Sequence, residues 1–255
     1  MEYGLAVDAI RPPSAALLAL EGRAWLEFAA LLPALPFLAR APRGDGHTVL
    51  VLPGWLASDR STRPLRWFIR GRGYHAHGWK LGRNLGPSPD TVAGLGRRFL
   101  ALRERHGGRR LTLIGWSLGG IFARELARRF PSDVRQVITL ASPFRDVSAT
   151  SVARLLRPRR SEGDGPELRR RLREPLPVPS TAIYSRTDGI VAWRSCMEDE
   201  GPLSESIEVL SSHCGMGHHP GVLLVIADRL AQGEGAWRPY AAGTRVADRA
   251  IEASA

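Results

Sequence analysis

The sequence predicts an α/β fold with about six mostly parallel strands, helices on both faces of the sheet, an N-terminal helical arm and a small lid. Three observations lead to this prediction. Short runs rich in valine, isoleucine and leucine alternate with longer segments of helical periodicity, which is typical of a parallel sheet. One strand-to-helix junction carries a glycine–serine–glycine turn. With 44% hydrophobic residues in 255, the chain can bury a large core.

The chain divides into three expected parts. Residues 1–45 form the helical arm, 46–235 the α/β domain with a candidate cap or lid at 145–179, and 236–255 a C-terminal tail. The net charge is +11, but Lys80 is the single lysine, which indicates compositional bias rather than selection for a polyanion. No zinc-finger spacing or RNA-recognition signature occurs, so we expect no specific nucleic-acid partner.

The arm is expected to be helical behind Ser14, a candidate N-cap. Apolar side chains recur there at helical spacing: Leu17, Leu18, Trp25, Phe28, Leu31 and Leu32. Glu21, Arg23 and Glu27 interrupt the apolar run and prolines break its second half, so the run does not predict a membrane span. We expect a helix packed on the main domain, with a membrane-surface helix or a substrate lid as the alternative.

The main domain alternates between strands and helices. The expected strands are residues 47–52, 75–80, 111–114, 134–140, 182–185 and 207–210. The expected helices are residues 62–71, 91–104, 118–129, 192–197 and 220–232. Asp90 is a suitable N-cap for the second of these helices, and Pro220 suits the first turn of the last.

Residues 145–179 break this alternation, because a connection of this length is far longer than is usual between neighbouring strands. The segment holds nine arginines, and its helical parts are amphipathic. Two interpretations stay open. The segment is either a small lid over the edge of the sheet that carries the site or a solvated surface excursion.

The most informative motif lies between residues 109 and 130. An apolar strand runs into Gly115-Trp116-Ser117-Leu118-Gly119, and a helical segment follows at once. A turn this tight leaves no room for side chains two residues before and two residues after the serine, and it pushes the serine hydroxyl into the open. Glycine occupies both places, and Gly120 lets the helix lie close to the sheet. This context of a nucleophile elbow indicates that Ser117 is a covalent nucleophile.

A nucleophilic serine needs a histidine to accept its proton and a carboxylate to orient that histidine. On this kind of scaffold the three follow in the order serine, acid, histidine. Asp188 is the candidate acid because it follows an expected strand, and Asp146, which also follows one, is the alternative. His213 is the candidate base after the last strand. His218 and His219 are its alternatives, better suited to the rim of the site or to capping a helix.

Hydrolysis also needs donors for the oxyanion that develops on the substrate. We expect two backbone N–H groups to supply them. One belongs to Leu118, directly after the nucleophile, and the other to Trp55 in the loop after the first strand, with Leu56 as the alternative to Trp55. Leu56, Trp116 and Met216 near these loops indicate an apolar substrate pocket.

Four segments together resemble a known family. They are the strand–GWSLGG–helix unit, the PGW loop after the first strand, the segment S-R-T-D-G-I-V and the segment S-H-C-G-M. In this order, over roughly residues 46–232, they resemble α/β-hydrolases, and specifically compact bacterial esterases and lipases. The resemblance implies hydrolysis of apolar acyl or aryl esters through an acyl-enzyme. A thioesterase or acyltransferase with the same triad, and a non-catalytic binding protein on the same fold, are the alternatives.

The remaining expectations concern small groups and location. No histidine, cysteine or carboxylate cluster has metal-ligand spacing, so we expect neither metal nor cofactor, only a small-molecule or lipid-like ester as partner. Without a signal peptide or transmembrane segment, the sequence predicts a cytoplasmic protein, and a weak membrane-surface contact through the N-terminal helix and the arginine-rich lid stays open. Cys196 and Cys214 are a candidate disulfide, with two free thiols as the alternative.

Overall fold

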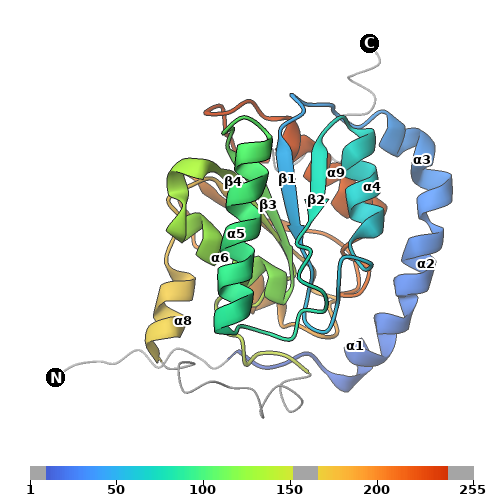
Figure 1. Ribbon diagram of the computed structural model, residues 1–255. Helices are drawn as coiled ribbons and strands as arrows, with labels where there is room; N and C mark the ends of the chain where they lie inside the picture. Colours follow the sequence, from blue (N-terminus) through green and yellow to red (C-terminus); the bar gives the residue numbers. More distant parts are fainter. Residues whose placement is uncertain (1–9, 152–165, 241–255) are drawn as a thin grey trace.

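The computed structural model describes residues 10–151 and 166–240 (Figure 1). Its strands are β1 (Thr48–Leu52), β2 (His75–Gly78), β3 (Leu111–Trp116), β4 (Val134–Leu140), β5 (Ser180–Tyr184) and β6 (Ser204–Glu208). They form one sheet in the order β2-β1-β3-β4-β5-β6, and every pairing between them is parallel. Each strand overlaps one of the expected strands, so the predicted α/β class is confirmed.

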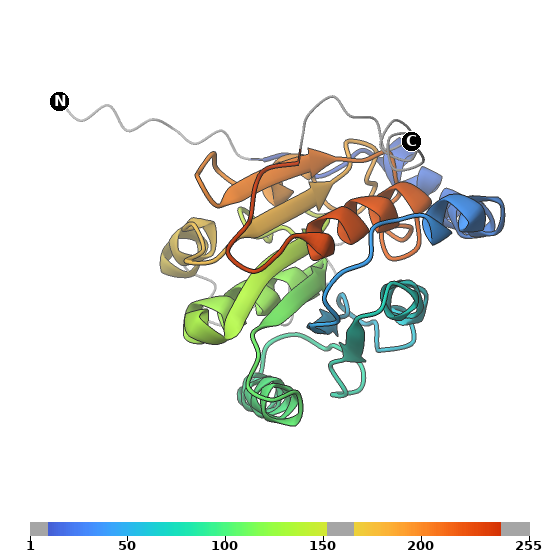
Figure 2. The same cartoon turned by 90° about the horizontal axis from the view of Figure 1, so that it is seen from above.

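Helices cover both faces of the sheet (Figure 2). Those over one face are α4 (Arg63–Gly71) and α9 (Pro220–Ala231), and those over the other are α5 (Pro89–Arg105) and α6 (Leu118–Arg129). In β1, Val49 and Val51 point into the core beneath α4 and α9, whereas Leu50 and Leu52 point into the core beneath α5 and α6. Because helices cover both faces, the central strands β1, β3, β4 and β5 are buried along their whole length.

Two details of the helix predictions are wrong. The N-cap of α5 is Ser88 rather than Asp90, because Ser88 Oγ accepts the N–H of Thr91 at 3.1 Å and Asp90 falls inside the first turn. The segment expected as an α-helix at 192–197 is a short 3₁₀ turn, η4 (Trp193–Cys196). It ends there because Met197 already returns to extended backbone conformation.

The N-terminal arm is helical, as its spacing predicts, but it is divided into short pieces. They are α1 (Ala15–Ala19), η1 (Leu20–Arg23), α2 (Ala24–Ala29) and α3 (Leu31–Ala39). Ser14 caps α1, because its Oγ accepts the N–H of Leu17 at 3.3 Å. The arm runs along the outer edge of the domain beside α4, and α3 contacts α9 (Figure 1). Among the helical residues of the arm, all of them described, Leu38 alone is buried.

The structure describes the two ends of the candidate lid, and residues 152–165 lie outside the described part. At the C-terminal end, α8 (Pro166–Arg173) contacts α6. Arg124 and Arg128 of α6 donate to the carbonyl oxygen of Glu174, at 3.1 and 2.6 Å. This end of the segment is therefore anchored to the domain, and a lid role for the whole segment stays a prediction.

The C-terminal tail begins on the main domain, and residues 241–255 lie outside the described part. The N–H of Tyr240 donates to Glu205 in β6 at 2.5 Å, and Arg229 of α9 donates to the carbonyl oxygen of Arg238 at 2.8 Å.

One further short helix lies between β3 and β4, where α6 is followed by the 3₁₀ helix η2 (Pro131–Asp133). None of the described helices is both long and apolar enough to cross a bilayer.

Candidate active site

The turn between β3 and α6 holds Ser117 in a strained backbone conformation. Its φ is 53° and its ψ is −122°, a combination that residues with a side chain rarely adopt. The flanking glycines are required by space. A Cβ on Gly115 would overlap the backbone of Gly119 and Gly120. A Cβ on Gly119 would overlap the carbonyl group of Leu52. The motif therefore forms the tight turn that its sequence predicts.

Asp188 and His213 are hydrogen bonded to each other at the carboxyl ends of β5 and β6. The distance from His213 Nδ1 to Asp188 Oδ2 is 2.7 Å, and both side chains are buried. The other carboxylate oxygen, Oδ1, accepts the N–H groups of Ile190 and Val191 at 2.8 and 2.7 Å. These bonds fix the carboxylate in the orientation that places the histidine ring.

The surroundings of His213 favour its charged form. Burial acts to lower the pKa of the imidazole, but the charge and hydrogen bond of Asp188, with a further contribution from Glu21, outweigh it. The net result is a pKa raised above the usual value for histidine. An imidazole in this setting is a stronger proton acceptor than one in water.

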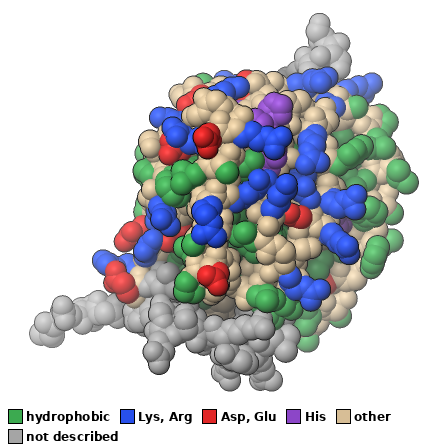
Figure 3. Space-filling model, viewed as in Figure 1, with side chains coloured by type: hydrophobic (Ala, Val, Ile, Leu, Met, Phe, Trp, Pro, Cys, Tyr) green, Lys and Arg blue, Asp and Glu red, His purple; other side chains and the backbone are tan. Residues whose placement is uncertain are grey.

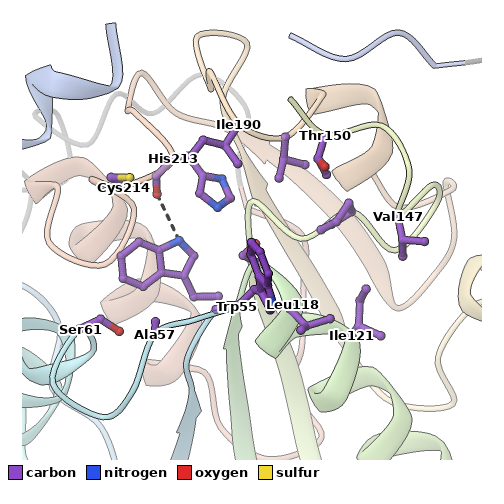
Figure 4. A pocket seen from close by; sticks show the side chains of 15 residues that line it. Trp55, Ala57, Ser61, Leu118, Ile121, Val147, Thr150, Ile190, His213 and Cys214 are labelled. Carbon is purple, nitrogen blue, oxygen red and sulfur yellow. Dashed lines mark hydrogen bonds between the residues drawn. The ribbon is translucent and has the colours of Figure 1, made fainter. Parts of the chain in front are cut away.

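Ser117 and His213 line the same cavity, which has a volume of about 380 Å³. Figure 4 shows His213, Ile190 and Thr150 along one side of it, and Ala57, Leu118 and Ile121 along the other. The indole N–H of Trp116, which precedes the serine, donates to the carbonyl oxygen of His213 at 3.1 Å (Figure 4). This bond ties the serine turn to the histidine loop.

The loop after β1 passes directly beside Ser117. A Cβ on Gly54 would lie 3.2 Å from the Cβ of Ser117, so a larger residue would crowd the serine. Trp55 lines the cavity next to it. Leu118 is the first residue of α6, where a backbone N–H has no carbonyl partner within its own helix. The two N–H groups expected as oxyanion donors thus belong to residues that line the cavity of Ser117.

Leu56 does not suit the role of alternative donor. Its N–H donates to the carbonyl oxygen of Asn84 at 2.7 Å and is therefore already engaged. Asn84 is buried, and its side-chain amide donates to the carbonyl oxygen of Pro53 at 2.8 Å. Asn84 accordingly braces the loop that carries Trp55.

The walls of the cavity are mainly apolar, but they differ from the expected set. Trp116 lines the cavity, whereas Leu56 does not, and Met216 is fully buried in the core beneath α9. Apolar residues that the sequence reasoning missed take their place: Ile121, Val147 and Ile190. Two of them had a signal in the sequence, because Ile121 follows Ser117 by one helical turn and Ile190 follows Asp188 by two residues.

The alternative triad candidates are engaged elsewhere. His218 Nε2 bonds the carbonyl oxygen of Ala24 at 3.0 Å. His219 caps α9, because its Nδ1 accepts the N–H of Gly221 at 3.2 Å, and Pro220 begins the helix as expected. Asp146 accepts the N–H and the hydroxyl of Ser148, at 2.9 and 2.6 Å, within its own turn.

The candidate disulfide is not formed: Cys196 and Cys214 are both free. Cys196 is buried beside Tyr184 and Val191, whereas Cys214 is exposed beside the cavity, so the two thiols face different surroundings. Partial burial of the thiol, together with the Glu21 carboxylate, raises the pKa of Cys214 to about 12. Within residues 10–151 and 166–240, no group of three or more histidine, cysteine or carboxylate side chains is arranged to hold a metal ion.

Comparison with known proteins identifies the class of this fold. The chain matches the alpha/beta hydrolase fold profile over residues 22–163, which is more than half of its length. The protein belongs to the α/β-hydrolase family. No curated protein sequence matches the chain.

Several solved structures share its architecture. The lipase BlEst2 of Bacillus licheniformis is similar with a TM-score of 0.55 at 14% identity, over 75% of this chain and 93% of the lipase. A structure of the metagenome-derived lipolytic enzymes LipS and LipT has a TM-score of 0.54 at 18% identity, over 74% and 93%. Lipase B of Aspergillus fumigatus has a TM-score of 0.54 at 16% identity, over 73% and 52%. At these identities the likeness establishes the fold.

Proposed function

We propose that the protein hydrolyses carboxylic esters through an acyl-enzyme, with Ser117 as nucleophile, His213 as base and Asp188 as the residue that orients the base. The observation that carries this proposal is the 2.7 Å hydrogen bond between His213 and Asp188 at the cavity that Ser117 lines. Membership of the α/β-hydrolase family supports it. So do the lipases and lipolytic enzymes among the similar structures.

In the proposed reaction, Ser117 Oγ attacks the ester carbonyl carbon while His213 accepts the hydroxyl proton. The N–H groups of Trp55 and Leu118 donate to the oxyanion. The C–O bond to the alcohol then breaks, His213 returns the proton to the departing oxygen, and the acyl group stays on Ser117. Water, deprotonated by His213, then attacks the acyl carbon. The bond between that carbon and Ser117 Oγ breaks, His213 returns the proton to Ser117 Oγ, and the acid is released. Asp188 stabilises the imidazolium in both steps.

The cavity favours apolar acyl or aryl groups. Its walls include Trp55, Trp116, Ile121 and Val147, and none of the described residues that line it is an aspartate, glutamate, lysine or arginine. Burial of apolar surface contributes about 25 cal/mol per Å², so such walls select lipid-like over charged substrates. A thioesterase or an acyltransferase would use the same three residues, and the choice between an oxygen ester and a thioester is made by the substrate assay below.

A fluorophosphonate probe tests the nucleophile. We expect wild-type protein to be labelled covalently and Ser117→Ala to lose the label. Ser61→Ala is the matched control, because Ser61 lines the same cavity and its hydroxyl donates to the carbonyl oxygen of Ser58 at 2.9 Å. Equal labelling of Ser117→Ala, or no labelling of wild type, contradicts the proposal. A chain-length series of nitrophenyl esters and thioesters then defines the substrate class.

We also propose that the arm contacts an anionic membrane surface. Its apolar side chains are open to solvent: Trp25 is 79% exposed, Leu26 74% and Leu32 73%. Trp67 of the neighbouring α4 is 63% exposed. Contiguous apolar patches of this kind on a surface are typical of interaction sites.

Charge supports an anionic bilayer as the partner of this surface. A groove of about 790 Å³ separates the arm from α4, with Phe28, Leu32 and Leu35 on one wall. Arg60, Arg63, Arg66, Arg70 and Trp67 lie on the other wall. Figure 3 shows hydrophobic side chains along the margin where Figure 1 draws the arm, with arginines beside them. Apolar groups that enter the acyl boundary next to arginines that bind phosphate match a negatively charged leaflet.

Vesicle co-sedimentation tests this second proposal. We expect binding to phosphatidylcholine vesicles that contain phosphatidylglycerol, and weak binding to pure phosphatidylcholine. The double variant Trp25→Ser/Leu32→Ser should lower the bound fraction at least about tenfold. Leu100→Ser, on α5 at the other face of the sheet, is the control and should bind as wild type does. Unchanged binding of the double variant contradicts the proposal, as does a dimer in light scattering that the double variant dissociates.

A further inference from the structure

Two carboxylates of the arm reach the loops that carry Asp188 and His213. Glu21 lies in η1 and Glu27 in α2, and both side chains point toward the carboxyl ends of β5 and β6. The sequence alone presented them as charges that interrupt an apolar run. In the folded chain they bind backbone groups more than 160 positions away.

Glu21 joins the two loops through one side chain. Its Oε1 accepts the N–H of Gly189 at 2.8 Å and the N–H of His213 at 3.0 Å. Its Oε2 accepts the N–H of Cys214 at 2.9 Å. A single carboxylate oxygen therefore links the residue after Asp188 to the histidine itself.

Glu27 and Arg23 extend this link on either side. Glu27 accepts the N–H and the hydroxyl of Ser212, at 2.8 and 2.6 Å. Arg23 pairs with Glu27 at 3.2 Å and donates to the carbonyl oxygen and the hydroxyl of Thr187, at 2.8 and 2.7 Å. The residues directly before Asp188 and directly before His213 are thus held by the arm as well.

Two glycines leave space for the arm at these loops. A Cβ on Gly189 would overlap the backbone of Leu17, and a Cβ on Gly215 would overlap the carboxylate of Glu27. Both glycines have negative φ, so backbone conformation does not require them there. Glycine is required at both positions because the arm approaches the loops so closely.

These contacts hold the two loops in position and place negative charge beside them. Without the arm, the N–H groups of Gly189, Ser212, His213 and Cys214 would lose their carboxylate acceptors, and hydrogen bonds to a charged acceptor are stronger than those between neutral groups. A loop that loses them can shift, and a shift of about 1 Å at a catalytic group costs up to about 100-fold in rate.

We propose that Glu21 is a positioning residue for the ester hydrolysis proposed above, holding the Asp188 and His213 loops in register and placing a negative charge behind the histidine. The inference rests on that proposed function for its kinetic readout only. The charged and titratable groups that face His213 are Asp188 from the loop after β5, Glu21 from η1 and the neighbouring thiol of Cys214. Glu27 does not bind His213 itself but Ser212, the residue before it.

Glu21→Gln tests the proposal, with the pKa of His213 measured by NMR titration of its imidazole. Removal of the charge leaves the imidazolium less stabilised, so the pKa of His213 should fall below the wild-type value. The acid limb of the kcat profile should move to lower pH with it, since hydrolysis needs neutral His213. On the plateau we expect kcat to fall about tenfold, because the pair is held less firmly.

Two further variants separate positioning from general stability. Glu205→Gln is the matched control, because Glu205 also accepts several bonds, from Thr181 at 2.7 Å and Arg229 at 2.8 Å, on strand β6 away from the cavity. It should lower the urea midpoint without moving the pKa of His213. Glu21→Asp keeps the charge, so its His213 pKa should stay nearer to wild type than that of Glu21→Gln.

The outcomes distinguish the two proposals. An unchanged His213 pKa in Glu21→Gln, or an equal fall in Glu205→Gln, overturns the role of Glu21. The NMR titration does not require turnover, so it decides this point even where wild type fails to react with the fluorophosphonate. In that case the ester-hydrolase proposal alone is overturned.

Discussion

The two halves of the candidate site are held in different ways. The turn that carries Ser117 depends on its immediate surroundings: adjacent glycines and a 2.8 Å bond from its N–H to the carbonyl oxygen of Leu140. The loops that carry Asp188 and His213 depend on the arm, whose Glu21 is 168 and 192 positions from the groups it binds there. The turn of the candidate nucleophile therefore relies on the glycines of its own motif, whereas the loops of the candidate acid and base also rely on a segment far away in the sequence.

Asp188→Asn tests the acid and base half and has the largest expected effect. The substitution keeps the size of the side chain but removes the charge that stabilises the imidazolium. We expect kcat for a nitrophenyl ester to fall by about 10³–10⁴-fold. Asp146→Asn is the matched control, because this carboxylate also follows a strand but binds only within its own turn. A comparable loss in Asp146→Asn would make Asp146 the acid and remove the basis of the comparison.

A glycine-to-alanine substitution in each half of the candidate site sharpens the comparison between the two halves. Gly119→Ala should lower the free energy of unfolding by about 3 kcal/mol, because its Cβ meets the carbonyl groups of Leu52 and Pro53 at the end of β1, which cannot move aside. Gly189→Ala should lower it by less, about 2 kcal/mol, because its Cβ meets the backbone of the arm at Leu17, and the arm can move further than a strand of the sheet can. Urea denaturation measures both. Trypsin should cleave Gly189→Ala faster at Arg23, and equal cleavage of the two variants would show that the arm is not held at Gly189.

Cys214→Ser has the smallest expected effect. Glu21 binds the backbone N–H of Cys214, which the substitution leaves in place, so kcat should stay within about twofold of wild type. With its pKa raised to about 12, the wild-type thiol should react slowly with iodoacetamide at pH 8. A tenfold loss of kcat in Cys214→Ser would mean that the thiol itself contributes to the site.

The sequence was informative where structure follows from neighbours. The central strands β1 and β3 could be predicted because buried parallel strands are rich in apolar residues, and the turn at Ser117 because only glycine fits beside it. The residues that line the pocket were harder to predict, because Met216 follows His213 closely in the sequence and yet points into the core. The partners of Glu21 could not be predicted at all, since nothing in a charged residue of an apolar helix indicates which distant backbone it binds.

The arm also sets an order of events during synthesis. Glu21 leaves the ribosome 192 residues before His213, and the Ser117 turn is complete well before either loop exists. Domains fold from the N-terminus as they emerge, but a contact this long in sequence closes last. We therefore expect the carboxylates of the arm to stay solvated until β6, the strand before His213, has joined the edge of the sheet. A chain still being synthesised thus contains the candidate nucleophile well before the residues proposed as its acid and base, so we expect the proposed reaction to become possible only once almost the whole domain has been made.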